Sequence, residues 1–80
     1  MRMIVFFDLP TKTKKNKKDY IRFRRFLLND GFDMMQFSVY TRIIVGQYGE
    51  QQHYDRLKNH LPPEGFVRCI TVTEKQYSNI

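Results

Sequence analysis

The first apolar run of the chain, residues 3–7, has no polar interruption and stops at one carboxylate, Asp8, before Leu9 and Pro10. Successive side chains of an extended segment point to opposite faces, and both faces of this run are apolar. The pattern predicts a strand that is buried on both sides and central in its sheet. Asp8 is then either a functional group at the strand end or the cap of the following turn. One face carries Ile4, Phe6 and Asp8, and the other carries Met3, Val5 and Phe7.

Residues 11–31 have the apolar spacing of an amphipathic helix. Thr11 or Thr13 is the expected N-cap, and Gly31 is expected just beyond the carboxyl end. The sequence therefore predicts one long helix with one buried face. That face carries Tyr20, Phe23 and Leu27, flanked by Ile21 and Leu28.

The opposite face of this helix is cationic, and Asp19 is the one acidic residue that interrupts the cations. Cations near a helix amino terminus oppose its dipole, and like charges at i, i+4 repel, each at about 0.2–1 kcal/mol. A solvated face would normally mix its charges, so we infer that this face binds phosphates. The basic stripe consists of Lys14, Lys18, Arg22 and Arg25 and ends at Asn29. The predicted nucleic-acid-binding residues are Lys14, Lys15, Lys18, Arg22 and Arg25.

The second half of the chain predicts two more strands, a helix and a last strand. Residues 32–45 are too long for one ordinary strand, which predicts two strands joined by a tight connection near Ser38. His53 and His60 lie on the predicted second helix without a nearby third ligand, which favours surface positions over a metal site. The expected elements are a loop at 46–49, a helix at 50–61, its end at 62–65, a strand at 66–73 and a turn at 74–77.

The element order β-α-β-β-α-β is that of a ferredoxin-like α+β fold, an antiparallel sheet with both helices on one face. We expect residues 1–80 to form one such domain. The other sheet face would be apolar without a cover, and a domain of this size buries little surface alone. A two-fold homodimer is the simplest cover.

The composition of the chain indicates which kind of partner it binds and in which cellular compartment it lies. The formal net charge is +6 and the pI is about 9.7, which favours an anionic partner, nucleic acid before a membrane surface. Cys69 is the one cysteine and lies in an apolar run, which indicates a reduced, cytoplasmic protein. We expect no signal peptide and no membrane span. No catalytic triad, glycine-rich phosphate loop or zinc ligand set is visible.

Four segments of the chain carry a family resemblance. They are Phe7-Asp8-Leu9-Pro10, Arg25-Phe26-Leu27-Leu28 with Gly31-Phe32, Gln36-Phe37-Ser38-Val39-Tyr40, and Thr71-Val72-Thr73-Glu74-Lys75-Gln76. Together they resemble the Cas2 family, the second of the two universal CRISPR spacer-acquisition proteins, and most closely its members from type II systems. The match covers nearly the whole chain, with the motifs in the right order.

The resemblance implies a ferredoxin-like homodimer that joins two dimers of the CRISPR integrase and lies along the backbone of the captured DNA duplex. It also implies a metal-dependent nuclease activity attached to Asp8, the aspartate at the end of the first strand. Ser38 and Tyr40 match the family segment at the turn near the dimer axis. A dimer axis close to Asp8 would let two Asp8 carboxylates share one Mg²⁺ ion.

Two departures from the family pattern bear on function. Many members have Tyr where this chain has Phe7, and members usually continue into a fifth strand, which we expect this chain, ending at Ile80, to lack. The first hypothesis is a non-catalytic DNA bridge within an integrase complex. The second is a magnesium-dependent endonuclease that acts on RNA or duplex DNA through Asp8. A ligand-binding regulatory module, the third, needs a polar pocket that the sequence does not reveal. No general base accompanies Asp8, which favours the bridge, with weak magnesium binding and slow cleavage.

Overall fold

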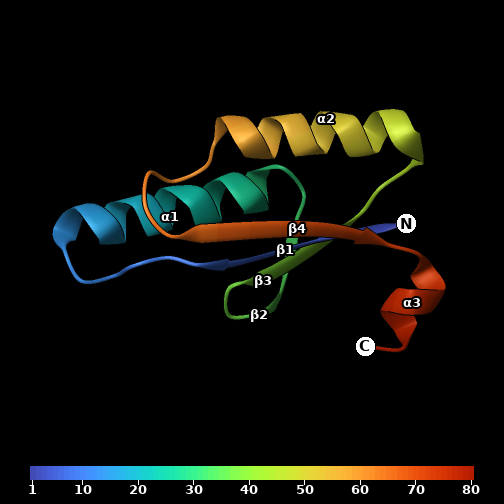
Figure 1. Ribbon diagram of the computed structural model, residues 1–80, viewed down its shortest axis with the longest axis horizontal. Coiled ribbons are helices and arrows are strands. Elements are labelled where there is room, and N and C mark those ends of the chain that lie inside the picture. Colours follow the sequence, from blue (N-terminus) through green and yellow to red (C-terminus); the bar gives the residue numbers. More distant parts are fainter.

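The strand at the amino terminus, β1 (Arg2–Asp8), lies inside a four-stranded antiparallel sheet of order β2-β3-β1-β4 (Figure 1). The computed structural model describes residues 1–80. The element order and the sheet topology confirm the ferredoxin-like fold and the central position of the first strand. The other elements are α1 (Lys14–Asn29), β2 (Asp33–Gln36), β3 (Val39–Ile43), α2 (Gly46–Asn59), β4 (Phe66–Val72) and α3 (Glu74–Ser78).

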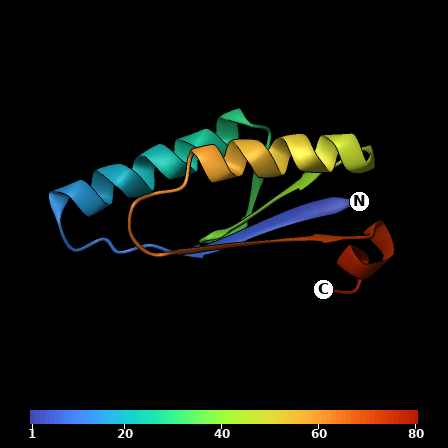
Figure 2. The same cartoon turned by 45° about the horizontal axis from the view of Figure 1, so that its top comes forward.

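The two faces of the sheet have different surroundings. Both α1 and α2 lie on one side of it, whereas α3 lies on the other side, beyond the end of β4 (Figures 1 and 2). Alternation along paired strands therefore sorts side chains into a helix-covered face and an uncovered face, which we call the open face. Its residues on β1, β3 and β4 are Arg2, Ile4, Phe6, Asp8, Val39, Thr41, Ile43, Phe66, Arg68, Ile70 and Val72.

The hydrophobic core lies between the helices and the covered face of the sheet. Three aromatic rings meet there: Phe7 stands edge-on to Phe23, with ring centroids 5.2 Å apart, and stacks on Tyr40 at 5.8 Å. Such contacts stabilise aromatic pairs beyond the effect of buried area. The buried core residues are Met3, Val5, Phe7, Phe23, Leu27, Phe32, Tyr40, Ile44 and Leu57.

Helix α1 begins and ends where its cap residues predicted. Thr13 forms a capping box with Asn16: its Oγ1 accepts from the Asn16 amide at 3.0 Å, and Asn16 Oδ1 accepts from the Thr13 amide at 3.3 Å. Gly31 has φ +91°, the left-handed conformation that ends many helices. Ile21 and Leu28, which the sequence pattern placed beside the buried face, do not extend that face, because they are 54% and 41% exposed. Phe23 and Leu27 define the buried face, and helical geometry turns neighbours one or two positions away outward.

The start of α2 and the predicted turn at 74–77 differ most from the prediction. Helix α2 begins at Gly46 and not at residue 50, because Gly46 adopts φ +71° and turns the chain into the helix directly after β3. The predicted turn at 74–77 is the short helix α3. Its capping box joins Thr73 to Gln76, with Thr73 Oγ1 accepting at 3.1 Å and Gln76 Oε1 accepting at 2.9 Å. None of the helices is long and apolar enough to span a bilayer.

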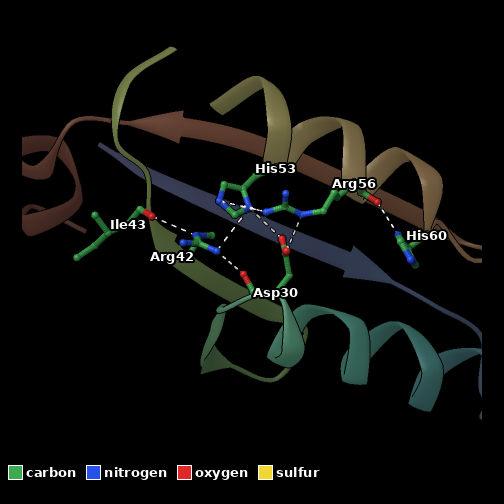
Figure 3. Close-up of polar contacts among 6 residues, drawn as sticks. All are labelled: Asp30, Arg42, Ile43, His53, Arg56 and His60. Atoms are coloured by element: carbon green, nitrogen blue, oxygen red, sulfur yellow. Dashed lines mark hydrogen bonds and ion pairs between the residues drawn. The ribbon is translucent and has the colours of Figure 1, made fainter. Parts of the chain in front are cut away.

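A polar cluster joins the end of α1 to β3 and α2 (Figure 3). The Asp30 carboxylate accepts from Arg56 Nε at 2.7 Å and lies 3.0 Å from His53 Nδ1. The Arg42 guanidinium donates to the Asp30 backbone carbonyl. Asp30 and His53 side chains are only 11% and 12% exposed. These cations face the negative end of the α1 dipole and hold α2 against α1.

Replacing Asp30 with Ala should destabilise the fold, because the nearly buried His53 and the Arg56 guanidinium lose their acceptor. We expect a loss of about 1–3 kcal/mol in the free energy of unfolding. For a chain of this size, that loss lowers the Tm by roughly 5–15 °C. Thermal unfolding followed by circular dichroism measures it. The matched control is Asp55→Ala on α2, since Asp55 is exposed and bonds only to Gln51; an equal shift in both variants would exclude a structural role for the cluster.

Candidate nucleic-acid interface

The basic stripe lies on the outer face of α1, opposite the residues that pack on the sheet. Asn16, Phe23 and Leu27 are the buried residues of this helix, so the stripe residues project away from the protein. All four of its cations are exposed, and none forms an ion pair with an acidic side chain. A shallow groove of about 250 Å³ runs along the helix between Lys18, Ile21, Arg22 and Arg25. The stripe is therefore an uncompensated positive surface.

Lys15 lies beside the stripe and differs from it. Its ammonium group forms an i, i+4 ion pair with Asp19 at 3.1 Å. The first turn of α1 holds no acidic residue, so this pair does not relieve the opposition between the stripe and the helix dipole. Of the five cations predicted to bind nucleic acid, Lys15 is thus the one whose charge is already partly matched.

Asp8 lies on the open face at the end of β1, exposed to solvent. It borders a hollow of about 240 Å³, which we call the Asp8 hollow. The structure brings Ser38 to this hollow, because the Phe7 amide donates to the Ser38 carbonyl at 3.1 Å. Ser38 has φ +63°, in the tight turn between β2 and β3 that the sequence predicted. The hollow is lined by Phe6, Phe7, Asp8, Ser38, Val39, Phe66 and Arg68.

The other residue assigned to the dimer interface, Tyr40, lies in the core. Tyr40 is paired with Val5 of β1, so its side chain points to the helix-covered face, and only 1% of it is exposed. Its ring stacks on Phe7. The side chain of Tyr40 is therefore unable to contact a partner in this fold, which corrects the sequence-based assignment and leaves Ser38 as the accessible one of the pair.

The residues around Asp8 do not make up a magnesium site within one chain. Asp8 is the one carboxylate in the hollow, and no three His, Cys, Asp or Glu side chains gather anywhere in the structure. Mg²⁺ is bound by one or two carboxylates together with waters and substrate phosphates. The two histidines are engaged elsewhere, His53 with Asp30 and His60 stacked on Phe26 with centroids 4.1 Å apart. A second carboxylate would have to come from another chain.

Arg68 is a member of the hollow that sequence reasoning missed. It is paired with Phe6 across β1 and β4, two register positions from the Asp8–Phe66 pair, with the Phe7–Val67 pair between them. Residues 66–72 place Arg68 on the same strand face as Phe66 and Ile70. A lone cation between exposed apolar residues on one strand face was the available signal, but its proximity to Asp8 depends on the register of β1 and β4.

A groove between α2 and the edge strand β4 contains Cys69, whose pKa is raised to about 11 by burial and, secondarily, by Glu50. The thiol is then neutral at physiological pH.

We expect iodoacetamide to modify Cys69 at pH 8 roughly 10-fold more slowly than an unfolded thiol. Because the folded pKa exceeds the unfolded one, the related stabilisation is present below pH 9 and is lost as the pH rises through about 11. Glu50→Gln should quicken the reaction; equal rates in the folded and unfolded chains would contradict this.

Comparisons with known proteins give one consistent family. The family model described as "CRISPR associated protein Cas2" matches residues 1–80. The chain is 58% identical to a CRISPR-associated endoribonuclease Cas2 of Acidovorax ebreus, over all of this chain and 78% of that protein. It is 44% identical to the protein of the same name from Streptococcus mutans serotype c, over all of this chain and 73% of that one.

A solved structure supports the fold. The crystal structure of Streptococcus pyogenes Cas2 at pH 6.5 superimposes with a TM-score of 0.74, over 100% of this chain and 95% of that one, at 18% identity. At that identity the likeness concerns the fold alone. The family model and the relatives carry the assignment, in agreement with the resemblance drawn from the four sequence segments. The chain belongs to the Cas2 family of CRISPR-associated proteins.

Proposed function

We propose that this protein acts as a homodimer that binds duplex DNA along the basic stripe and bridges integrase subunits during CRISPR spacer acquisition. The observation that carries the proposal is the row of four exposed cations on one helix face, without an acidic partner in the chain. The stripe opposes the α1 dipole, and phosphate contacts would offset that cost. The family assignment supports the role in CRISPR adaptation, and the integrase is the partner that the resemblance implies.

The expected binding mode is contact with the DNA backbone. From Lys14 to Arg25 the helix rises about 16 Å, which spans roughly five base pairs of a duplex. Ammonium and guanidinium groups supply charge to phosphates, whereas base recognition needs side chains placed in a groove. We therefore expect little sequence preference and a steep dependence of affinity on salt.

Magnesium-dependent endonuclease activity at Asp8 is the alternative function. Its support is the name of the relatives, which are called endoribonucleases, together with the exposed Asp8 carboxylate in its hollow. One Mg²⁺ shared by the Asp8 carboxylates of two protomers would act on RNA or duplex DNA. The geometry favours the DNA-bridging function. The stripe lies on the outer side of α1, which covers one face of the sheet, whereas Asp8 lies on the other, open face of the sheet. A phosphate bound to the stripe is thus held away from the Asp8 of the same chain.

Replacing Asp8 with Ala separates the two functions. At protein concentrations at which the variant is dimeric, we expect it to bind duplex DNA like the wild type, because Asp8 does not lie on the stripe. We expect the pure wild-type protein to cleave RNA and duplex DNA slowly at most in magnesium, since no general base and no second carboxylate stand beside Asp8. Gel assays with end-labelled RNA and DNA, with magnesium or with EDTA, measure both. Rapid magnesium-dependent cleavage that Asp8→Ala abolishes would make the nuclease the primary function.

A further inference from the structure

Two opposite charges on the open face, Asp8 and Arg68, have no partner within the chain. Both side chains are exposed and line the Asp8 hollow, yet neither takes part in an ion pair. Another cation of the same face, Arg2, is paired with Glu74 at 3.2 Å and lies over the Tyr77 ring. Asp8 and Arg68, both in the hollow, are thus the charged residues of β1 and β4 that have no ion-pair partner.

The surroundings of these charges are apolar and exposed. Phe66 is 70% exposed, Ile70 48% and Ile43 54%, and all three lie on the open face. In the homodimer of the proposed function, on which this inference rests, a second chain covers this face and removes water from both charges. An unpaired charge buried in an interface is strongly destabilising, whereas a charge with an oppositely charged hydrogen-bonding partner is tolerated.

A two-fold interface makes the open face meet its own copy. If one residue contacts a second across the axis, the second also contacts the first. A face that carries one carboxylate and one guanidinium close together is therefore complementary to itself, whereas two facing carboxylates would repel each other. We propose that in the dimer the Asp8 carboxylate of each protomer pairs with Arg68 of the partner subunit.

In such a pair, Arg68 orients and occupies the Asp8 carboxylate of the partner subunit. A guanidinium bonds to a carboxylate through two parallel N–H donors, which fixes the orientation of both groups. Each dimer would contain two copies of this pair, one on either side of the axis. The carboxylate that binds the guanidinium is occupied, so Arg68 competes with a cation for Asp8.

Single charge reversals should each weaken the dimer. Asp8→Lys brings two cations together at each pair, and Arg68→Glu brings two carboxylates together. Since close charge pairs at interfaces are strongly coupled and each dimer holds two of them, we expect the dimer dissociation constant to rise at least about 100-fold. Sedimentation equilibrium measures this constant, and circular dichroism verifies that each variant is folded.

Mixing the two variants tests whether the pair crosses between protomers. In a mixed dimer, Lys at position 8 of one chain faces Glu at position 68 of the other, while Asp8 faces Arg68 at the second pair. Native mass spectrometry of the mixture should therefore show the mixed dimer in excess over both homodimers. The matched control mixes Arg24→Glu with Asp55→Lys, two exposed reversals on the helix side, which should dimerise like the wild type and combine statistically.

The outcomes separate this inference from the proposed function. Weak homodimers and a dominant mixed dimer support the pair. Single variants that dimerise like the wild type, or a statistical mixture, would overturn the pair while leaving the homodimer in place. A wild-type protein that sediments as one chain of 9.8 kDa would instead remove the homodimer itself.

Discussion

Charge reversal at Lys18 and Arg22 together should reduce the affinity for duplex DNA by at least about 100-fold near physiological salt. These two residues lie in the middle of the basic stripe and line its groove, so phosphates that reach the stripe contact them first. Each lost phosphate contact also removes about 0.9 from the slope of log affinity against log salt. Fluorescence anisotropy with a labelled duplex, repeated at several salt concentrations, measures both quantities.

The control for this variant changes the net charge by the same amount elsewhere. Lys58 on α2 and Lys75 on α3 are exposed and lie outside the stripe. Reversing both should weaken binding only slightly, through the overall charge of the protein. Equal losses in the two double variants would show that net charge, and not the α1 face, determines binding.

A carboxylate placed on the open face should prevent dimerisation. Ile70 is paired with Ile4 in the middle of β1 and β4 and is 48% exposed. In Ile70→Asp, a homodimer would have to bury two unpaired carboxylates, which costs several kcal/mol each. We expect a rise of about 1,000-fold or more in the dimer dissociation constant. Multi-angle light scattering at micromolar concentration should then give the mass of a single chain.

A similarly exposed isoleucine on the helix side provides the control for the open face. Ile21 is 54% exposed on α1. Its replacement by Asp should leave the dimer intact, because α1 lies on the opposite side of the sheet (Figure 2). An Ile70→Asp protein that stays dimeric, or an Ile21→Asp protein that dissociates, would place the interface elsewhere.

Much of the fold was predictable because its main signals are local. The uninterrupted apolar run of residues 3–7 indicates a central strand, and the helical spacing of Phe23 and Leu27 indicates the buried face of α1. Thr13 and Gly31 mark the ends of α1 by their own backbone preferences. The start of α2 was not predictable in this way. It depends on the conformation of Gly46 after β3, and no periodic pattern in the sequence predicts that conformation.

A candidate site was predictable from the sequence when all its residues lie on a single helix or strand. The basic stripe needs only the geometry of a single helix, so its residues followed directly from spacing. Arg68 lies in the same hollow as Asp8 only because of the register of two strands that lie far apart in sequence. The contact of Asp30 with His53 likewise joins residues 23 positions apart, and it depends on the packing of α2 against α1.

Tyr40 shows how a motif match misplaces a residue. Ser38 and Tyr40 stand two positions apart, which suggests a shared strand face, but Ser38 lies in the turn with φ +63° and the alternation starts only at Val39. Tyr40 is then directed into the core, where its ring supports Phe7. The Phe7 ring packs in the core against Phe23 and Tyr40, so its identity as Phe is explained by packing.

We propose that the protein contributes DNA binding to spacer acquisition through α1 and not catalysis through Asp8. The most direct measurement is integration of a duplex into a CRISPR array by the purified integrase from the same source, with wild-type protein, Asp8→Ala or Lys18→Glu/Arg22→Glu. At a protein concentration at which both variants are dimeric, we predict that Asp8→Ala supports integration like the wild type and that the stripe variant supports almost none. Loss of integration with Asp8→Ala, together with normal integration by the stripe variant, would contradict the account.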